Sequence, residues 1–342
     1  MSGPVLREVG DAEGGMRLDR WFRAHFPALG HGRLQKFLRT GQVRVDGRRV
    51  KAGARLQAGQ CVRVPPGALT VPDGEGRSAS QTEARPSPAG TARDREFLES
   101  LLLHRDDFVI ALDKPPGLAV QGGTRTARHI DAMLDGLASA PGSERPRLVH
   151  RLDKDTSGVL LIAPDRRAAT ALGRALKDRD VKKIYWALVV GTPEPGEGVI
   201  DLALVKAGTA GAERVRVARP GETDAQAART DYRVIERAGR RLAWLELVPR
   251  TGRTHQLRVH ALAIGHPIVG DGKYGGEAAH PGNDIPPKLH LHARAITIPH
   301  PRLGTLEICA PLPPHMAESW RFLGFDAGSG GAAGSRRTGW RP

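Results

Sequence analysis

The stretch Leu148–Gly158 (LVHRLDKDTSG) runs directly into the apolar segment Val159–Ala163 (VLLIA). The apolar segment is short, branched and continuous, which predicts a strand covered on both faces. Asp153 then lies on a loop anchored by rigid structure, among polar neighbours that can hold its carboxylate in one orientation. Such a carboxylate is suited to nucleophilic or acid/base chemistry. A polar turn that only leads into a strand would contain the same residue types, because Asp is common in turns.

The complete stretch favours the chemical interpretation, because it resembles the HRLDxxTSG signature of RNA pseudouridine synthases. Three further segments resemble other motifs of that family in the same order along the chain. They are Leu112–Val120 (LDKPPGLAV), Lys183–Val189 (KIYWALV) and Thr251–His260 (TGRTHQLRVH). The resemblance covers about residues 16–325 and is greatest to a branch that modifies large-subunit ribosomal RNA. Strings typical of that branch are Val120–Gly123, Glu213–Val217 and Leu291–Ala293.

The resemblance implies a role for three residues in catalysis. Asp153 would be the catalytic carboxylate, and Arg258 would hold and charge-stabilise it. Tyr185 would stack on the uracil and offer a phenol for proton transfer. The resemblance implies further contacts to the RNA substrate from residues of the signature and of the segment Leu112–Val120. These residues are Arg151, His150, Lys114, Pro115, Gly117 and Thr156. The Arg151 guanidinium could stack where the target base had been, or could bind a phosphate.

The implied reaction determines which chemical groups the site needs. Conversion of uridine to pseudouridine breaks the N1–C1′ bond, turns the uracil and joins C1′ to C5, with no atom gained and no electron transferred. The resemblance therefore implies no cofactor and no metal. The target base must leave its stack, which costs a few kcal/mol that protein contacts offset. His290 and His292, two apart on a predicted strand, are the competing metal hypothesis, but they lack a Cys partner at ligand spacing.

The chain divides into segments by composition. A small N-terminal domain is predicted over residues 16–66, a flexible linker over 67–94, a catalytic domain over 95–325 and a disordered tail over 326–342. The catalytic domain is predicted to be α/β (α+β), with strands near 108–112, 184–190, 230–236 and 242–248, and helices near 168–176 and 253–264. The family resemblance implies a mixed, largely antiparallel sheet with a central cleft.

The N-terminal domain has two predicted helices and a hairpin. Leu18, Trp21, Phe22 and Phe26 form one apolar helix face, and a second helix buries Leu34, Phe37 and Leu38. The hairpin is predicted over Val43–Val50, with an Asp-Gly turn. This order resembles the alpha-L RNA-binding domain, in which cations follow the phosphate backbone. The predicted RNA-binding cations are Arg33, Lys36, Arg39 and Arg44.

Composition agrees with an RNA partner, for which 23S ribosomal RNA is the leading candidate. Lys and Arg number 52 against 37 Asp and Glu, giving a formal charge of +15 and a pI near 10.6, as expected for a protein that binds a polyanion. No apolar run reaches the roughly 18 residues of a membrane span. The N-terminus lacks the apolar core of a signal peptide. We therefore expect a cytoplasmic monomer that does not associate with membranes.

Two alternative functions remain open on the sequence. One is a synthase of the same family that acts on transfer RNA, since related branches share these motifs. The other is a non-catalytic RNA-binding or ribosome-assembly factor on the same fold. Loss of Asp153, Tyr185 or Arg258 would indicate the second alternative, and all three residues are present.

Overall fold

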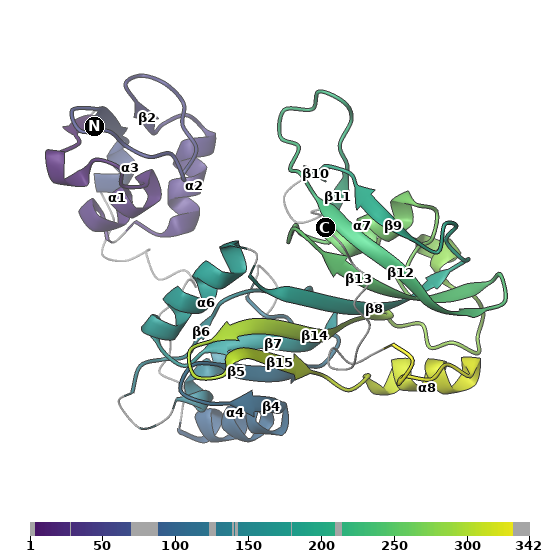
Figure 1. Ribbon diagram of the computed structural model, residues 1–342. Helices are drawn as coiled ribbons and strands as arrows, with labels where there is room; N and C mark the ends of the chain where they lie inside the picture. Colours follow the sequence, from purple (N-terminus) through teal and green to yellow (C-terminus); the bar gives the residue numbers. More distant parts are fainter. Residues whose placement is uncertain are drawn as a thin grey trace. The chain divides into compact units, whose positions relative to one another are not determined.

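The chain forms two compact units, residues 1–86 and 87–342 (Figure 1). This computed structural model describes residues 4–27, 29–69, 88–122, 128–138, 140, 143–178, 180–208 and 214–330. Each unit buries its own set of apolar side chains. None of the helices in these ranges is long and apolar enough to cross a membrane.

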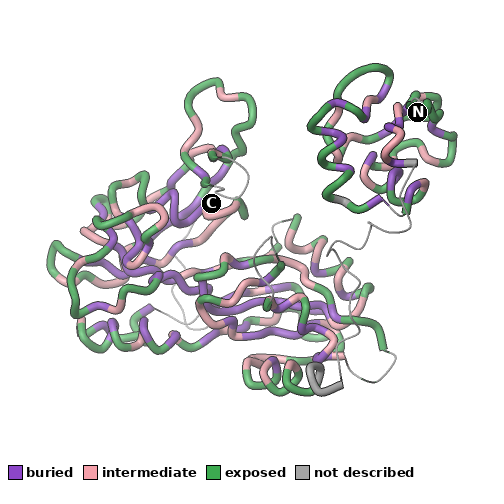
Figure 2. Tube along the Cα trace, turned by 180° about the vertical axis from the view of Figure 1, so that it is seen from behind, coloured by how far each residue is buried: buried purple, intermediate pink, exposed green. Residues whose placement is uncertain are grey.

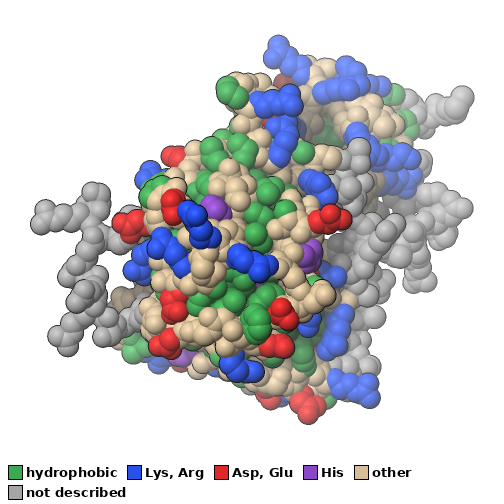
Figure 3. Space-filling model, turned by 90° about the vertical axis from the view of Figure 1, so that its right-hand side faces the viewer, with side chains coloured by type: hydrophobic (Ala, Val, Ile, Leu, Met, Phe, Trp, Pro, Cys, Tyr) green, Lys and Arg blue, Asp and Glu red, His purple; other side chains and the backbone are tan. Residues whose placement is uncertain are grey.

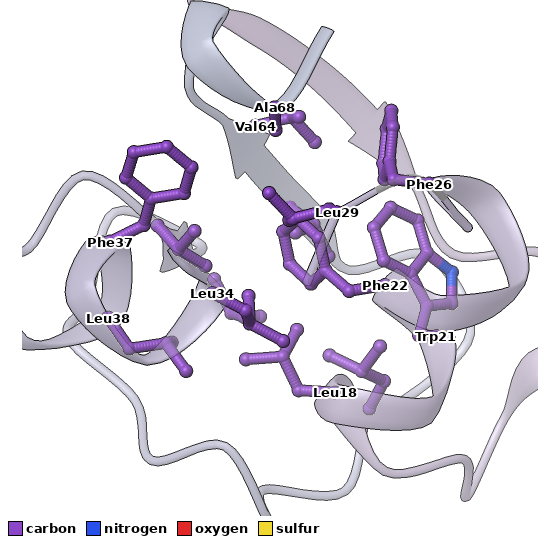
Figure 4. Packing of buried hydrophobic residues seen from close by; sticks show 14 of the residues in the cluster. Leu18, Trp21, Phe22, Phe26, Leu29, Leu34, Phe37, Leu38, Val64 and Ala68 are labelled. Carbon is purple, nitrogen blue, oxygen red and sulfur yellow. The ribbon is translucent and has the colours of Figure 1, made fainter. Parts of the chain in front are cut away.

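The N-terminal unit packs short helices against a three-stranded antiparallel sheet of order β1-β3-β2. Its elements are β1 (Val5–Glu8), η1 (Asp11–Glu13), α1 (Leu18–His25), α2 (His31–Arg39), β2 (Arg44–Val45), β3 (Cys61–Val64) and α3 (Pro66–Leu69). The apolar faces predicted for the two helices are confirmed, because their side chains meet in one core with Val64 and Ala68 (Figure 4). Independent burial of this kind gives the unit a fold of its own.

The predicted hairpin is only partly correct. Asp46 and Gly47 do form a tight turn with φ of 48° and 76°, and Val45 and Arg48 exchange backbone hydrogen bonds across it. The strand β2, however, forms its ladder with β3, and the only bridge toward residues 48–50 in the described part of the chain joins Val45 to Arg48. Pairing with β3 brings Val45 and Val62 into the same core, whereas Arg48 and Arg49 remain exposed.

The C-terminal unit is built on a ten-stranded mixed sheet. The main path is β4-β5-β7-β14-β8-β13-β12-β9, with β15 paired to β14 and β6 paired to β7. The strands are β4 (Leu102–Arg105), β5 (Ile110–Lys114), β6 (Arg147–Leu148), β7 (Ser157–Ala163), β8 (Lys182–Val190), β9 (Glu197–Asp201), β12 (Arg229–Ala238), β13 (Leu242–Pro249), β14 (Leu291–His300) and β15 (Gly304–Cys309). All pairs are antiparallel except β7 with β14, so the predicted fold class is confirmed.

Helices cover both faces of this sheet. They are α4 (Pro88–Ser100), α5 (Ile130–Met133), η2 (Leu134–Leu137), α6 (Arg166–Asp178), α7 (Gln256–Ala263), η3 (Gly276–Ala279) and α8 (Pro314–Leu323). On β7, Leu160 and Ile162 pack toward α4 and α5, whereas Val159, Leu161 and Ala163 pack toward α6. The strand is therefore buried along its whole length, as its continuous apolar sequence predicts (Figure 2).

The second half of the sheet repeats this arrangement. Ala187 and Val189 of β8 face α7, while Trp186 and Leu188 face α8. A separate two-stranded sheet of β10 (Leu204–Ala207) and β11 (Arg214–Val217) packs beside α7. The predicted helix near 253–264 forms as α7 but begins only at Gln256, because residues 251–255 make a turn before it.

The parallel contact between β7 and β14 requires glycine in the signature. Only two residue pairs join these strands, His292 with Ser157 and Ala293 with Gly158. Gly158 has φ of 103°, and a Cβ there would lie 2.2 Å from the Ala293 carbonyl oxygen. No residue with a side chain fits that approach. The last residue of the signature is thus fixed by the sheet.

Parts of the predicted linker and tail lie within the described residues. Residues 66–69 and 88–94, at the two ends of the predicted linker, are helical, while its centre, residues 70–87, lies outside the described ranges. In the predicted tail, the Asp326 backbone N–H donates to Glu236, and Gly330 is buried against Trp186 and Trp244. Packing against these two tryptophan rings holds Gly330 in place. Residues 331–342 lie outside the described part of the chain.

Candidate active site

Asp153 lies in the turn between β6 and β7, at the wall shared by two cavities of about 780 and 540 Å³. The turn is closed by the Thr156 backbone N–H, which donates to the Asp153 carbonyl at 3.2 Å. The Asp153 side chain is 26% exposed, so its carboxylate is accessible from the cavities while its backbone is fixed by β7. This placement agrees with the position expected for a reactive carboxylate.

Lys114 ties the loop after β5 to the Asp153 turn. Its side chain is fully buried, and its ammonium donates to the carbonyls of Pro115, Leu118 and Lys154, each at 2.9 Å. The Gly117 backbone N–H donates to the same Lys154 carbonyl. Burial lowers the pKa of Lys114 to about 7, although the charges of nearby aspartates oppose this shift.

The position of Lys114 corrects its predicted role as an RNA contact. An ammonium has three N–H donors, and three backbone carbonyls accept them here. The lysine therefore acts as an internal brace for the turn that carries Asp153. Pro115 contributes its carbonyl to the same brace, whereas Gly117 lines the smaller cavity.

Arg258 is buried on α7, with a side chain 6% exposed. Its closest acid is Asp271, which it grips through Nε at 2.8 Å and Nη2 at 2.7 Å. Nη1 lies 4.0 Å from the Asp153 carboxylate. Burial disfavours the charged guanidinium, but the hydrogen bonds to Asp271 outweigh this and raise the pKa of Arg258. Asp271 thus orients a cation that faces Asp153 without touching it.

Tyr185 reaches the larger cavity from β8. In the sheet it lies opposite Leu247 of β13 and Ala293 of β14, which fix its backbone. Burial raises the pKa of the Tyr185 phenol above its usual value, and the charge of Asp153 acts in the same direction. The phenol is therefore protonated at neutral pH and can donate a hydrogen bond in the cavity. Asp153, Tyr185 and Arg258 thus line one cavity from three different elements.

His150 and Arg151 precede Asp153 and differ in their surroundings. The His150 Nε2 accepts a hydrogen bond from the Leu161 backbone N–H at 2.8 Å. Burial lowers the pKa of His150 to about 3, and the charge of Lys183 acts in the same direction. This neutral ring therefore docks the loop onto β7, although it also lines the cavity. Arg151 is exposed at the cavity wall, 3.5 Å from Gln121 Oε1.

Thr156 lines the same cavity, with its side-chain oxygen buried. Its side chain is 2% exposed, and its Oγ1 has no hydrogen-bond partner among the described residues. A buried hydroxyl without a partner is costly, by about 1–3 kcal/mol.

Four residues near Asp153 were missed by the sequence interpretation. Lys183 and His255 line the larger cavity, while Asp271 and Tyr274 hold Arg258 and His255 from behind. His255 stands inside the Thr251–His260 motif, so the sequence does offer it as a candidate site residue. No local pattern links Asp271 to Arg258, because 13 residues separate them and only the tertiary fold brings them together.

The basic residues predicted in the N-terminal unit lie on its surface. Arg33, Lys36 and Arg39 are exposed on α2. Arg44 is half-buried and donates to the carbonyls of Gly41 and Gly47. In the view of Figure 3, Lys and Arg side chains are spread over the visible surface, with Asp and Glu side chains among them.

His290 and His292 do not converge on a common site. His290 contacts Ser319 and the Lys288 carbonyl, whereas His292 contacts Ser157 and the Ala310 carbonyl. Burial lowers the pKa of each ring to about 4. These partners give both rings a structural role around β14. Within the described ranges, no three His, Cys, Asp or Glu side chains are grouped to hold a metal.

The site combines an accessible carboxylate with a buried guanidinium, a protonated phenol and basic residues along the cavity. Residues 108–263 match the family model described as RNA pseudouridylate synthase. The chain is 34% identical to ribosomal large subunit pseudouridine synthase C of Vibrio cholerae, covering 91% of this chain and 94% of that protein. It is also 34% identical to the mitochondrial RNA pseudouridine synthase 4 of Arabidopsis thaliana, covering 89% and 78%.

A solved structure supports the same relationship. The human protein named RNA pseudouridylate synthase domain containing 4 superposes with a TM-score of 0.54 at 29% sequence identity. The match covers 68% of this chain and 97% of the human chain.

Proposed function

Because this chain belongs to the RNA pseudouridylate synthase family, we propose that it isomerises specific uridines of 23S ribosomal RNA, with Asp153 as the catalytic carboxylate. The family assignment makes the protein an isomerase. The choice of 23S RNA is supported by the relative from Vibrio cholerae, whose name refers to the ribosomal large subunit. The net charge of +15 supports a polyanionic substrate.

The observation that carries the proposal is the position of the Asp153 carboxylate. It is exposed to a cavity of about 780 Å³, within 4.0 Å of a buried guanidinium and on a turn braced by Lys114. A preorganised charge in such a cavity stabilises a transition state more than it would in water. The same residues weaken the alternative of a non-catalytic RNA-binding factor, because binding alone needs no braced carboxylate.

The other residues that line the cavity take supporting roles. Tyr185 offers a flat face for the extruded uracil and a protonated phenol for hydrogen bonding. Thr156 forms part of the cavity wall beside Asp153. Arg151, exposed at the wall, is placed to contact the RNA beside the extruded base. The Arg258 guanidinium faces the carboxylate at 4.0 Å, with no direct hydrogen bond to it.

The decisive experiment is the substitution Asp153→Asn, which keeps the side-chain shape and removes the charge. We expect no pseudouridine from this variant, while its RNA affinity stays within roughly tenfold, or about 1.4 kcal/mol, of the wild-type value. Tritium release or direct mapping on a 23S fragment measures product, and filter binding measures affinity. Substantial turnover by Asp153→Asn at an unchanged melting temperature would eliminate the proposed role.

The RNA target is tested separately. Pseudouridine is mapped across all cellular RNA in a strain that lacks the gene and in the same strain complemented with the wild type. Sites that disappear from 23S RNA and return on complementation support the proposal. Sites that disappear only from transfer RNA would assign the enzyme to the other substrate class.

A further inference from the structure

His255 bridges the catalytic carboxylate and a second tyrosine. It stands in the turn before α7 with φ of 53°, in the left-handed region that residues other than glycine seldom adopt. Its Nε2 lies 3.9 Å from Asp153 Oδ1, and its Nδ1 lies 2.6 Å from the Tyr274 hydroxyl. The ring lines both cavities that meet at Asp153. The backbone conformation thus places one imidazole between two polar groups.

The hydrogen-bond partners of Tyr274 determine which nitrogen of His255 carries the proton. The Tyr274 oxygen accepts the Val215 backbone N–H at 3.1 Å, and its ring packs 5.1 Å from the Arg258 guanidinium carbon. Burial raises the pKa of Tyr274, so the phenol keeps its proton at neutral pH. That proton is directed at His255 Nδ1, which accepts it.

The charge state of His255 completes the assignment. Burial lowers the pKa of His255; the negative charges of Asp153 and Asp271 oppose this shift, and the positive charges of Arg258 and Lys273 reinforce it. The ring is therefore neutral at neutral pH. A neutral imidazole that accepts at Nδ1 carries its hydrogen on Nε2. The N–H thus faces the space beside Asp153, at a separation too long for a direct hydrogen bond.

We propose that Tyr274 fixes the tautomer of His255, so that the Nε2–H donates to an oxygen of the uracil held beside Asp153. This inference rests on the proposed function. When the N1–C1′ bond breaks with its electron pair left on the ring, the uracil oxygens become stronger acceptors. A fixed donor then stabilises the transition state more than the bound substrate, which raises kcat.

Two amide substitutions at His255 distinguish the effect of side-chain length from the effect of the left-handed backbone conformation. The side chain in His255→Gln is long enough to place an N–H near the Nε2 position. His255→Asn carries the same amide on a shorter side chain, and Asn tolerates the left-handed backbone well. We expect the kcat of His255→Asn to fall about 100-fold below the wild-type kcat, with nearly unchanged RNA affinity. We expect His255→Gln to retain most of the wild-type kcat. His280→Asn, at an exposed histidine outside both cavity linings, is the control.

Equal kcat for the Gln, Asn and wild-type proteins would overturn the proposal, while the Asp153→Asn result would still test the proposed function independently. A direct readout does not depend on any variant being active. In protein labelled with ¹⁵N-histidine, the imidazole nitrogens of His255 should show the Nε2–H tautomer at neutral pH. The Tyr274→Phe variant, which keeps the ring over Arg258, should lose this tautomer preference. An Nδ1–H tautomer or an imidazolium in the wild type would refute the assignment even if His255 variants fold poorly.

Discussion

Two side-chain nitrogens lie at almost the same distance from the Asp153 carboxylate oxygens. Arg258 Nη1 is 4.0 Å away and His255 Nε2 is 3.9 Å away, and each is held from behind, by Asp271 and Tyr274 respectively. A tight ion pair would occupy the carboxylate and lower its nucleophilicity. The observed spacing leaves the charge of the arginine in place while the carboxylate oxygens remain available to substrate.

Arg258 donates two hydrogen bonds to Asp271. We therefore expect that a positive charge alone at position 258 will not support full activity. Arg258→Lys keeps the charge but offers a point donor without the planar fork. We expect Arg258→Lys and Arg258→Ala each to lose roughly 100-fold in turnover, about 2.7 kcal/mol of transition-state stabilisation. The Ala variant should also lose about 3–5 kcal/mol of folding free energy, because it leaves Asp271 buried and unpaired. Single-turnover assays and chemical denaturation measure these effects, and a fully active Lys variant would contradict the positioning argument.

At the scale of elements, the contact between β7 and β14 leaves no space for a side chain at Gly158. Gly158→Ala combines an unfavourable φ with a Cβ 2.2 Å from the Ala293 carbonyl oxygen. We expect a loss of at least about 2 kcal/mol in the free energy of unfolding. Gly173→Ala in α6 is the matched control, since a Cβ there contacts nothing within 4 Å and should stabilise the helix by about 0.5–1 kcal/mol. Equal denaturation midpoints for the two variants would count against the close approach.

Asp106, between β4 and β5, joins two strands and the segment that leads into β5 through one carboxylate. It accepts from His104 of β4 at 2.8 Å, from His300 of β14 at 3.0 Å, and from the backbone N–H groups of Phe108 and Val109. Burial alone would raise the pKa of Asp106, but these hydrogen bonds outweigh it and hold the pKa well below the usual value. The unfolded chain therefore binds a proton at higher pH than the folded protein does.

The sign of the resulting pH dependence follows from that difference. The stabilisation by Asp106 is fully present above about pH 4, the pKa range of an unfolded-chain Asp, and it is lost as the pH falls further. We expect wild type to be more stable than Asp106→Ala by roughly 1–3 kcal/mol at pH 7, with the difference shrinking below pH 4. Denaturant titrations at several pH values measure it. A difference that grows on acidification would show that the carboxylate is not the stabilising form.

The elements that the sequence predicts well are those whose pattern is local. The continuous apolar run of β7 and the helical spacing of Leu18, Trp21 and Phe22 both report burial directly. The partner of β2 could not be obtained this way, because the Asp-Gly turn indicates a hairpin with residues 48–50 while the core selects β3. Lys114 and Arg258 show the same limit at the site. Their chemistry is visible in the motifs, but the Lys154 carbonyl that binds Lys114 and the Asp271 carboxylate that binds Arg258 lie outside those motifs' local patterns.

At the scale of the whole molecule, the N-terminal unit is expected to contribute RNA affinity without contributing to catalysis. Its three exposed cations on α2, Arg33, Lys36 and Arg39, are replaced together by Gln, which leaves the buried face of the helix unchanged. If they contact phosphates, the slope of log affinity against log salt should fall by about 2. Turnover at saturating RNA should remain near the wild-type value. An unchanged salt slope with unchanged affinity would remove these residues from the RNA-binding surface.

The place of β14 in the sheet also determines when the cavity can first exist. In the sheet path, β14 is the strand that joins the half containing β4, β5 and β7 to the half containing β8, β13, β12 and β9. Synthesis proceeds from the N-terminus, so both halves leave the ribosome before Leu291, the first residue of β14. Until then β7 and β8 each present an open edge, which is prone to wrong pairing. The Asp153 carboxylate belongs to the first half and Arg258 to the second, so a nascent chain shorter than this holds no assembled site.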